Sequence, residues 1–225
     1  MKDKVILVTG AHGALGSVVA QHLLSLGATV AGADRAEAPS VAQAAGFLPV
    51  PADLSTSAGA AAAIQAVIEK FSRIDGVVHT VGGFAFGALH ELSDQEWGRL
   101  VDANLNSAFH LLRAVLGPMR ERRYGRIVMI GSLAAAQPQP NLSAYVATKA
   151  ALHALVQSAA LENRYFDVTI NAILPGTINT PANRASMPAA DPARWLAPQK
   201  LAQLCAQLLS DPDGTLTGAL LPLER

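Results

Sequence analysis

The chain has 225 residues, of which 51% are hydrophobic and 15% are charged; this composition supports one domain with a full core and excludes an intrinsically disordered chain. The 17 basic and 17 acidic residues give a formal net charge of zero, so the chain lacks the excess positive charge that is typical of proteins that bind nucleic acid or an anionic membrane. No stretch approaches the roughly 18 apolar residues of a membrane span, and the apolar run after the N-terminus is too short for a signal peptide. We therefore expect a cytoplasmic protein whose single cysteine, Cys205, is a buried and inert thiol.

Short β-branched runs alternate with longer alanine- and leucine-rich stretches along the chain. Several short runs are continuously apolar, which indicates strands buried on both faces of a parallel sheet. The alternation predicts a single-domain, doubly wound, Rossmann-like α/β fold over residues 1–225, with a parallel seven-stranded sheet. Strands are predicted at 5–9, 29–33, 47–51, 76–80, 126–130, 168–174 and 216–221, and helices at 14–25, 58–71, 94–120, 144–163 and 198–209, with a weaker helix at 36–45.

The first predicted strand runs into a glycine-rich turn, Thr9-Gly-Ala-His-Gly-Ala-Leu-Gly16. Gly10 allows the tight turn, Gly13 lets the backbone approach a pyrophosphate, and Gly16 lets the following helix pack closely on the sheet. The N-terminus of that helix would face the phosphates. Because the turn directly follows a strand and precedes a helix, it predicts a dinucleotide site.

Acidic residues follow the second and third predicted strands. The carboxylate of Asp34 can accept hydrogen bonds from both hydroxyls of an adenosine ribose and would repel a 2′-phosphate, which favours NAD as the cofactor. Arg35 could instead recruit that phosphate, so NADP is the alternative. Asp53 could contact the adenine amine, or it could serve only as a helix N-cap or turn residue.

Tyr145 and Lys149 stand four residues apart in a predicted helix, and Ser132 follows the fifth predicted strand. Residues at this spacing share a helix face. The pKa of a free phenol is about 10, so the nearby lysine charge is expected to lower the pKa of Tyr145 and let it exchange a proton with a substrate oxygen. Taken alone, the same spacing is more often an ordinary pair on a helix surface.

Together these residues resemble the short-chain dehydrogenase/reductase family, in its small single-domain branch, over essentially the whole chain. The resemblance implies four catalytic positions. Asn104 would hold a water near Lys149, Ser132 would stabilise charge on the substrate oxygen, Tyr145 would exchange its proton, and Lys149 would also hold the nicotinamide ribose. It implies no metal, and it implies cofactor contacts from Gly10, His12, Gly13, Leu15, Gly16, Asp34, Arg35, Asp53, Leu54, Gly82, Tyr145, Lys149, Pro175, Gly176, Thr177 and Thr180.

The chain departs from the usual family pattern at two places. His79-Thr-Val-Gly82 replaces the usual Asn-Asn-Ala-Gly, which leaves open how the sheet is hydrogen-bonded to the helices, and Ala14 stands at a usual glycine. With residues 174–188, these features resemble the dihydropteridine reductase branch, which lacks the catalytic serine. Because Ser132 and Asn104 are both present, we expect hydride transfer between nicotinamide and a small carbonyl or alcohol substrate. A pterin or quinonoid reductase, or a dinucleotide-sensing protein without turnover, stays as an alternative.

Residues 175–198 interrupt the strand–helix alternation with several prolines and are predicted to form an irregular substrate loop. The loops predicted near the nicotinamide contain both apolar and polar residues. This composition suggests an apolar or aromatic substrate with one or two polar groups. The candidate pocket residues are Phe84, Phe86, Leu133, Gln137, Asn141, Asn183, Arg184, Met187 and Trp195. The two longest predicted helices are rich in apolar residues, and related proteins pair through such helices, so we expect a homodimer or homotetramer.

Overall fold

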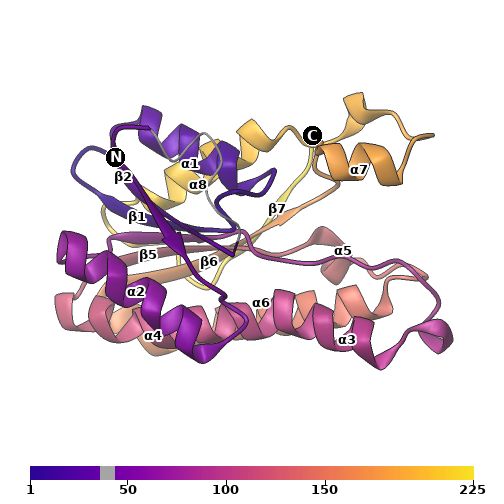
Figure 1. Cartoon of the computed structure of the whole chain (residues 1–225), viewed down its shortest axis with the longest axis horizontal. Helices are drawn as coiled ribbons and strands as arrows, with labels where there is room; N and C mark the ends of the chain where they lie inside the picture. The colour runs from indigo at the N-terminus through magenta and orange to yellow at the C-terminus, as the bar shows by residue number, and fades with distance from the viewer. Residues whose placement is uncertain (36–43) are drawn as a thin grey trace.

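The computed structural model describes residues 1–35 and 44–225, so the weaker predicted helix at 36–45 falls largely outside the described residues. A seven-stranded sheet with the order β3-β2-β1-β4-β5-β6-β7 forms the middle layer (Figure 1). All six strand pairings are parallel, which confirms the predicted doubly wound fold. The strands are β1 (Val5–Thr9), β2 (Thr29–Asp34), β3 (Phe47–Pro51), β4 (Gly76–His79), β5 (Gly125–Ile130), β6 (Val168–Pro175) and β7 (Leu220–Leu223).

Helices cover both faces of the sheet. In Figure 1, α1 (Gly16–Ser25) and α8 (Pro198–Leu209) lie on one side, and α2 (Ser57–Phe71), α4 (Ser107–Arg122) and α6 (Ser143–Asn163) lie on the other. Side chains of β1 alternate between two buried cores, as strand geometry requires: Val5 and Leu7 join one, and Ile6 and Val8 join the other. Cys205 is fully buried in α8, and burial raises the pKa of its thiol to about 12.

The predicted helix at 94–120 is interrupted. Helix α3 (Asp94–Val101) begins after Ser93, whose hydroxyl accepts a hydrogen bond from the amide of Glu96, and α4 begins at Ser107. Between them, Asp102–Asn106 forms one π-helical turn (η3). A π turn inserts an extra residue without breaking the helix, so apolar spacing does not reveal it.

Two predicted segments differ from the structure. The last strand is β7 (Leu220–Leu223). Just before it, the amide of Gly218 and the carbonyl of Ala219 bond to the backbone of β6, and the Asn171 side chain donates to the carbonyl of Leu216 and accepts from the amide of Ala219. The segment 175–198 is more regular than predicted. It contains α7 (Pro181–Ser186), which is capped by Thr180, and the 3-10 turn η5 (Pro192–Arg194), and Ile178 and Leu196 pair across its base.

Three short elements complete the described chain: η2 (Leu89–Glu91), α5 (Leu133–Ala136) and η4 (Arg164–Phe166). No helix within residues 1–35 and 44–225 is long and apolar enough to cross a membrane. Strands β2 and β3 lie on one side of β1, and β4 to β7 lie on the other. The direction of winding therefore reverses between β1 and β4, and ligands of such sheets bind in the crevice at the carboxyl ends of the strands there.

Candidate active site

The glycine turn occupies this crevice. Gly10 has a φ of +67°, and a Cβ atom on Gly16 would lie 2.0 Å from the carbonyl oxygen of Gly10. Both glycines are therefore required by the fold itself. A Cβ on Gly13 would meet only the Gly10 carbonyl oxygen, at 3.2 Å, and Gly13 is exposed. The turn thus keeps an open backbone surface at the N-terminus of α1, and this fits the phosphates of a dinucleotide.

Asp34 lies beside that turn, at the end of β2. Its Oδ2 atom accepts a hydrogen bond of 3.0 Å from the backbone amide of His12, so the structure brings together two predicted cofactor residues that are distant in the sequence. Arg35 is exposed next to it.

The two predicted cofactor residues after β3 have different surroundings. Asp53 Oδ1 accepts from both the hydroxyl and the amide of Ser55, which lowers the pKa of the Asp53 carboxyl. Asp53 is thus a turn residue, and Thr56 caps α2 in its place. Leu54 is 3% exposed and packs in the core, so only its backbone can reach a cofactor.

Ser132, Tyr145 and Lys149 converge at the carboxyl end of β5. Helix α6 carries Tyr145 and Lys149 on one face, and the Ser132 side chain lies close enough to Tyr145 to affect the pKa of the phenol. Lys149 is buried, and its Nζ atom donates to the carbonyl oxygen of Ile130 at 2.8 Å. Burial lowers the pKa of Lys149 to about 8.

The expectation that the lysine charge lowers the pKa of Tyr145 is wrong for this structure. Burial raises the pKa of Tyr145, and the neighbouring Ser132 side chain opposes that rise only in part. Lys149 directs its ammonium group to the Ile130 carbonyl. The phenol is therefore held in its protonated form at neutral pH.

Asn104 lies in the π turn and is fully buried. Its side-chain amide donates to the carbonyl of Gly83 and to the hydroxyl of Thr148, each at 3.0 Å, and its Oδ1 atom accepts from the amide of Gly83. A Cβ on Gly82 would lie 3.0 Å from Asn104 Oδ1 and 3.3 Å from Lys149 Nζ. Asn104 therefore fastens the loop after β4 to α6 beside Lys149. Thr148 was not predicted as a site residue, although its place directly before Lys149 was a usable signal.

The imidazole of His79 links the sheet to helix α4 by hydrogen bonds. The imidazole is 1% exposed; its Nδ1 atom lies 2.8 Å from Thr9 Oγ1, and its Nε2 atom lies 3.2 Å from Ser107 Oγ. The Ser107 hydroxyl donates to the carbonyl of Ala103, so it accepts from Nε2–H, and Nδ1 accepts from Thr9. His79 is therefore neutral, and it connects β1 and β4 to the start of α4.

This neutral histidine predicts a pH-dependent stability. Burial, assisted by the charge of Lys149, lowers the folded-state pKa of His79 to about 3. The unfolded chain protonates this residue near its ordinary pKa of about 6.5, so the free energy of unfolding falls by about 1.4 kcal/mol per pH unit as the pH drops from about 6.5 towards about 3. Urea unfolding of wild type and His79→Asn across that window measures it. Equal slopes for the two proteins would contradict the assignment.

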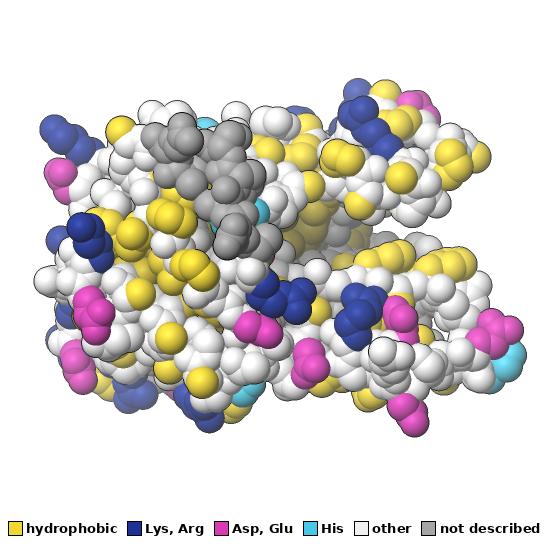
Figure 2. Space-filling model, in the orientation of Figure 1, with side chains coloured by type: hydrophobic (Ala, Val, Ile, Leu, Met, Phe, Trp, Pro, Cys, Tyr) yellow, Lys and Arg dark blue, Asp and Glu magenta, His cyan; other side chains and the backbone are white. Residues whose placement is uncertain are grey.

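The aromatic ring of Phe84 contacts Tyr145. The rings of Phe84 and Tyr145 meet edge to face with centroids 5.0 Å apart, and the Phe84 carbonyl accepts from Arg99 at 2.9 Å. Phe84 and Phe86 are 57% and 68% exposed. Figure 2 shows a hollow at this end of the molecule, between the lobe that carries α7 and the part that carries α3, with hydrophobic side chains on both walls.

The segment 175–198 is held at its base and by its own side chains. Gly176 donates to the carbonyl of Leu223, and the carbonyl of Thr177 accepts from Leu196. Asn183 donates to the carbonyl of Ile178, and Arg184 donates to Asn179 Oδ1 at 2.7 Å. Asn183 and Arg184, which were predicted to line the pocket, thus bind within their own segment.

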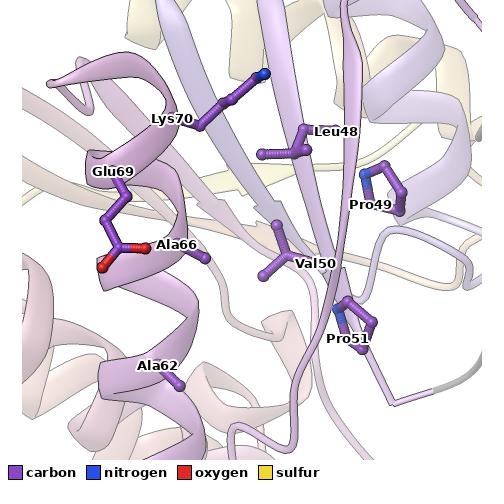
Figure 3. A pocket seen from close by; sticks show the side chains of 8 residues that line it. All are labelled: Leu48, Pro49, Val50, Pro51, Ala62, Ala66, Glu69 and Lys70. Atoms are coloured by element: carbon purple, nitrogen blue, oxygen red, sulfur yellow. The ribbon is translucent and has the colours of Figure 1, made fainter.

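A separate groove of about 550 Å³ runs between β3 and α2. In Figure 3, Leu48 and Val50 point from β3 toward α2, and Pro49 and Pro51 lie on the other side of the strand. The remaining lining residues are Ala62, Ala66, Glu69 and Lys70. This groove lies at the edge strand β3, whereas Ser132, Tyr145 and Lys149 lie at the carboxyl end of β5.

Comparison with known proteins identifies this arrangement. The family model described as short chain dehydrogenase matches residues 4–191. The 3-oxoacyl-(acyl-carrier-protein) reductase FabG of Escherichia coli (strain K12) is 32% identical, over 98% of this chain and 95% of the relative. Two solved structures are each 28% identical. Levodione reductase has a TM-score of 0.92 over 100% of this chain and 97% of its own. The 3-ketoacyl-(acyl-carrier-protein) reductase from Brucella melitensis complexed with NADH has a TM-score of 0.90, over 99% and 97%. The chain therefore belongs to the short-chain dehydrogenase family of oxidoreductases.

Proposed function

We propose that this protein is an NAD-dependent oxidoreductase that interconverts a small carbonyl compound and its alcohol. The observation that carries the proposal is the convergence of Ser132, Tyr145 and the buried Lys149 at the carboxyl end of β5, in a sheet whose switch point holds the glycine turn. When bound, the nicotinamide supplies or accepts the hydride. The FabG relative and the levodione reductase neighbour are reductases by name, in keeping with this chemistry.

The side chains have distinct proposed roles. Tyr145, kept protonated by burial, donates its proton to the substrate oxygen during reduction and recovers one from the alcohol during oxidation. Ser132 donates a hydrogen bond to the same oxygen as charge develops on it. Lys149 holds the nicotinamide ribose, and Asn104 keeps the loop at Gly82 and Gly83 in place beside it. The segment 175–198 forms the substrate loop.

The remaining predicted cofactor residues divide by location. Residues from Gly10 to Gly16, with His12 and Leu15, would hold the pyrophosphate. Asp34 and Leu54 would border the adenosine, with Arg35 and Asp53 exposed nearby. Pro175, Gly176, Thr177 and Thr180, at and beyond the carboxyl end of β6, would border the nicotinamide.

Asp34 supports NAD over NADP, because a carboxylate repels the 2′-phosphate of NADP. Replacing Asp34 with serine removes that repulsion and should raise the NADPH-to-NADH ratio of kcat/KM by about 10- to 100-fold. Arg35→Ala is the opposing variant, which lowers NADPH use if Arg35 recruits the phosphate. Steady-state kinetics with both cofactors measures these ratios, and a wild-type preference for NADPH would contradict the proposal.

A substrate panel tests the function and separates it from its alternatives. Cyclic and aromatic ketones, short 3-ketoacyl thioesters, quinones and quinonoid dihydropterin are each compared by kcat/KM with NADH. We expect the ketones or ketoacyl compounds to be reduced fastest. Turnover of quinonoid dihydropterin alone would favour the pterin reductase, and cofactor binding without turnover of any compound would favour a dinucleotide sensor.

We also propose that the protein is a homodimer or homotetramer. Phe109 on α4 and Leu161 on α6 are 42% and 63% exposed, and Tyr165, just beyond α6, is 70% exposed. A second copy packed on α4 and α6 would remove these apolar side chains from water. Light scattering of the purified protein should give at least twice the mass of the chain, and a monomer at micromolar concentration would exclude the proposal.

A further inference from the structure

A third polar residue extends the face of α6 that carries Tyr145 and Lys149. His153 follows Lys149 by four residues, so the three side chains lie in one row along the helix. The imidazole is 6% exposed. A polar ring buried at this depth requires a hydrogen-bond partner.

That partner is the backbone of Ser132. The amide of Ser132 donates a hydrogen bond of 3.3 Å to His153 Nε2. Because an amide can only donate, Nε2 carries no proton, and the neutral ring has its proton on Nδ1. Burial, and next the charge of Lys149, lower the pKa of His153 and keep it neutral.

Gly131, the residue before Ser132, leaves room for this contact because it has no side chain. A Cβ on Gly131 would lie 2.4 Å from His153 Nε2, so only glycine lets the ring approach the end of β5. Gly131 itself donates to the carbonyl of Ile173 at 2.8 Å. The strand end that delivers Ser132 is thus held by β6 through Gly131 and by α6 through His153.

Among residues 1–35 and 44–225, the acceptor for the backbone amide of Ser132 is His153 Nε2. The residue is extended, with φ −159° and ψ 136°, and its hydroxyl accepts from the amide of Ala134 at 3.3 Å. Without the imidazole, the buried amide would lose its acceptor, and the peptide would turn to find another. A turn of this peptide moves the hydroxyl relative to Tyr145.

We propose that His153 is a positioning residue, which fixes the Ser132 hydroxyl against the substrate oxygen by accepting the Ser132 amide. The catalytic consequence rests on the proposed function, in which Ser132 acts on that oxygen. The hydrogen bond between the Ser132 amide and His153 is independent of the proposed function.

A double-mutant cycle tests the proposal. His153→Leu is expected to lower kcat by about 10- to 100-fold, with the dissociation constant of NADH unchanged within about twofold. In the Ser132→Ala background the same substitution should change kcat by no more than about twofold, because both substitutions remove one interaction. His153→Gln, whose side-chain oxygen can accept the amide, should restore most of kcat. Val156→Ala, a buried change on the same helix, should lower the melting temperature with kcat unchanged.

The outcomes separate the two proposals. Equal effects of His153→Leu in the wild-type and Ser132→Ala backgrounds, or no rescue by glutamine, would overturn the role of His153 alone. A normal kcat for Ser132→Ala would overturn the proposed function of Ser132 and the catalytic consequence with it. The ¹⁵N shifts of the imidazole test the contact without turnover: an unprotonated Nε2 that changes in Gly131→Ala supports it, and a protonated Nε2 overturns it.

Discussion

Replacing Tyr145 with phenylalanine is expected to lower kcat by about 100- to 10,000-fold. The substitution removes only the hydroxyl, so it keeps the edge-to-face contact with Phe84 and the packing of α6. The dissociation constant of NADH should stay within about twofold, because binding does not use the phenolic proton. Single-turnover kinetics and a fluorescence titration with NADH measure the two quantities separately.

Tyr165→Phe is the matched control. It makes the same chemical change at a tyrosine that is 70% exposed in η4 and bonded to Arg164, and it should leave turnover unchanged. A Tyr145→Phe enzyme that keeps more than a fifth of wild-type turnover would exclude Tyr145 as the proton donor.

Replacing Gly16 with alanine is expected to abolish cofactor binding and to destabilise the fold by about 3 kcal/mol or more. The new Cβ would lie 2.0 Å from the Gly10 carbonyl oxygen and 2.7 Å from its carbon, and both are backbone atoms that cannot swing away. Helix α1 must therefore move off the turn. Urea unfolding and NADH titration measure the two effects.

Two other glycines serve as controls. Gly13→Ala places its Cβ 3.2 Å from the same oxygen, so it should cost about 1 kcal/mol or less yet still weaken cofactor binding if a pyrophosphate approaches there. Gly98→Ala, in α3, meets no atom within 4 Å and should stabilise the protein by about 0.5 to 1 kcal/mol. Equal stability of the Gly16→Ala and Gly98→Ala variants would contradict the account of the turn.

The sequence was sufficient to predict the layers of the fold, because its signals are local and repeated. Strands β1 and β3 and helix α8 have the predicted bounds, since continuous apolar runs are distinct from helical periodicity. The convergence of Ser132 with Tyr145 was also predictable in outline, because a helix that follows a parallel strand begins at the edge of the sheet where that strand ends, and Tyr145 lies in the first turn of α6.

The features that were missed depend on contacts between distant residues. The π turn at Asn104 adds a single residue to a helical stretch, and so small an insertion does not stand out in the sequence pattern. The residues before β7 are bonded to the side chain of Asn171, in another strand, and the local sequence does not show this contact. The pKa of Tyr145 was assigned the wrong direction because the motif places Lys149 nearby, but discloses neither the burial of the phenol nor the binding of the ammonium group to Ile130.

The hydrogen-bonding role of His153 was missed for a related reason. Its four-residue spacing from Lys149 was visible in the sequence, but only the fold brings the amide of Ser132 to its ring.

The central claim is that this chain transfers hydride to a carbonyl carbon, and isotope transfer tests it most directly. The enzyme is incubated with NADH carrying deuterium at the transferable position of the nicotinamide, together with the best carbonyl substrate of the panel. We predict one deuterium on the carbinol carbon of the product for each NADH oxidised, and loss of this product in Tyr145→Phe. NADH bound with no deuterated alcohol formed from any carbonyl compound would contradict the account.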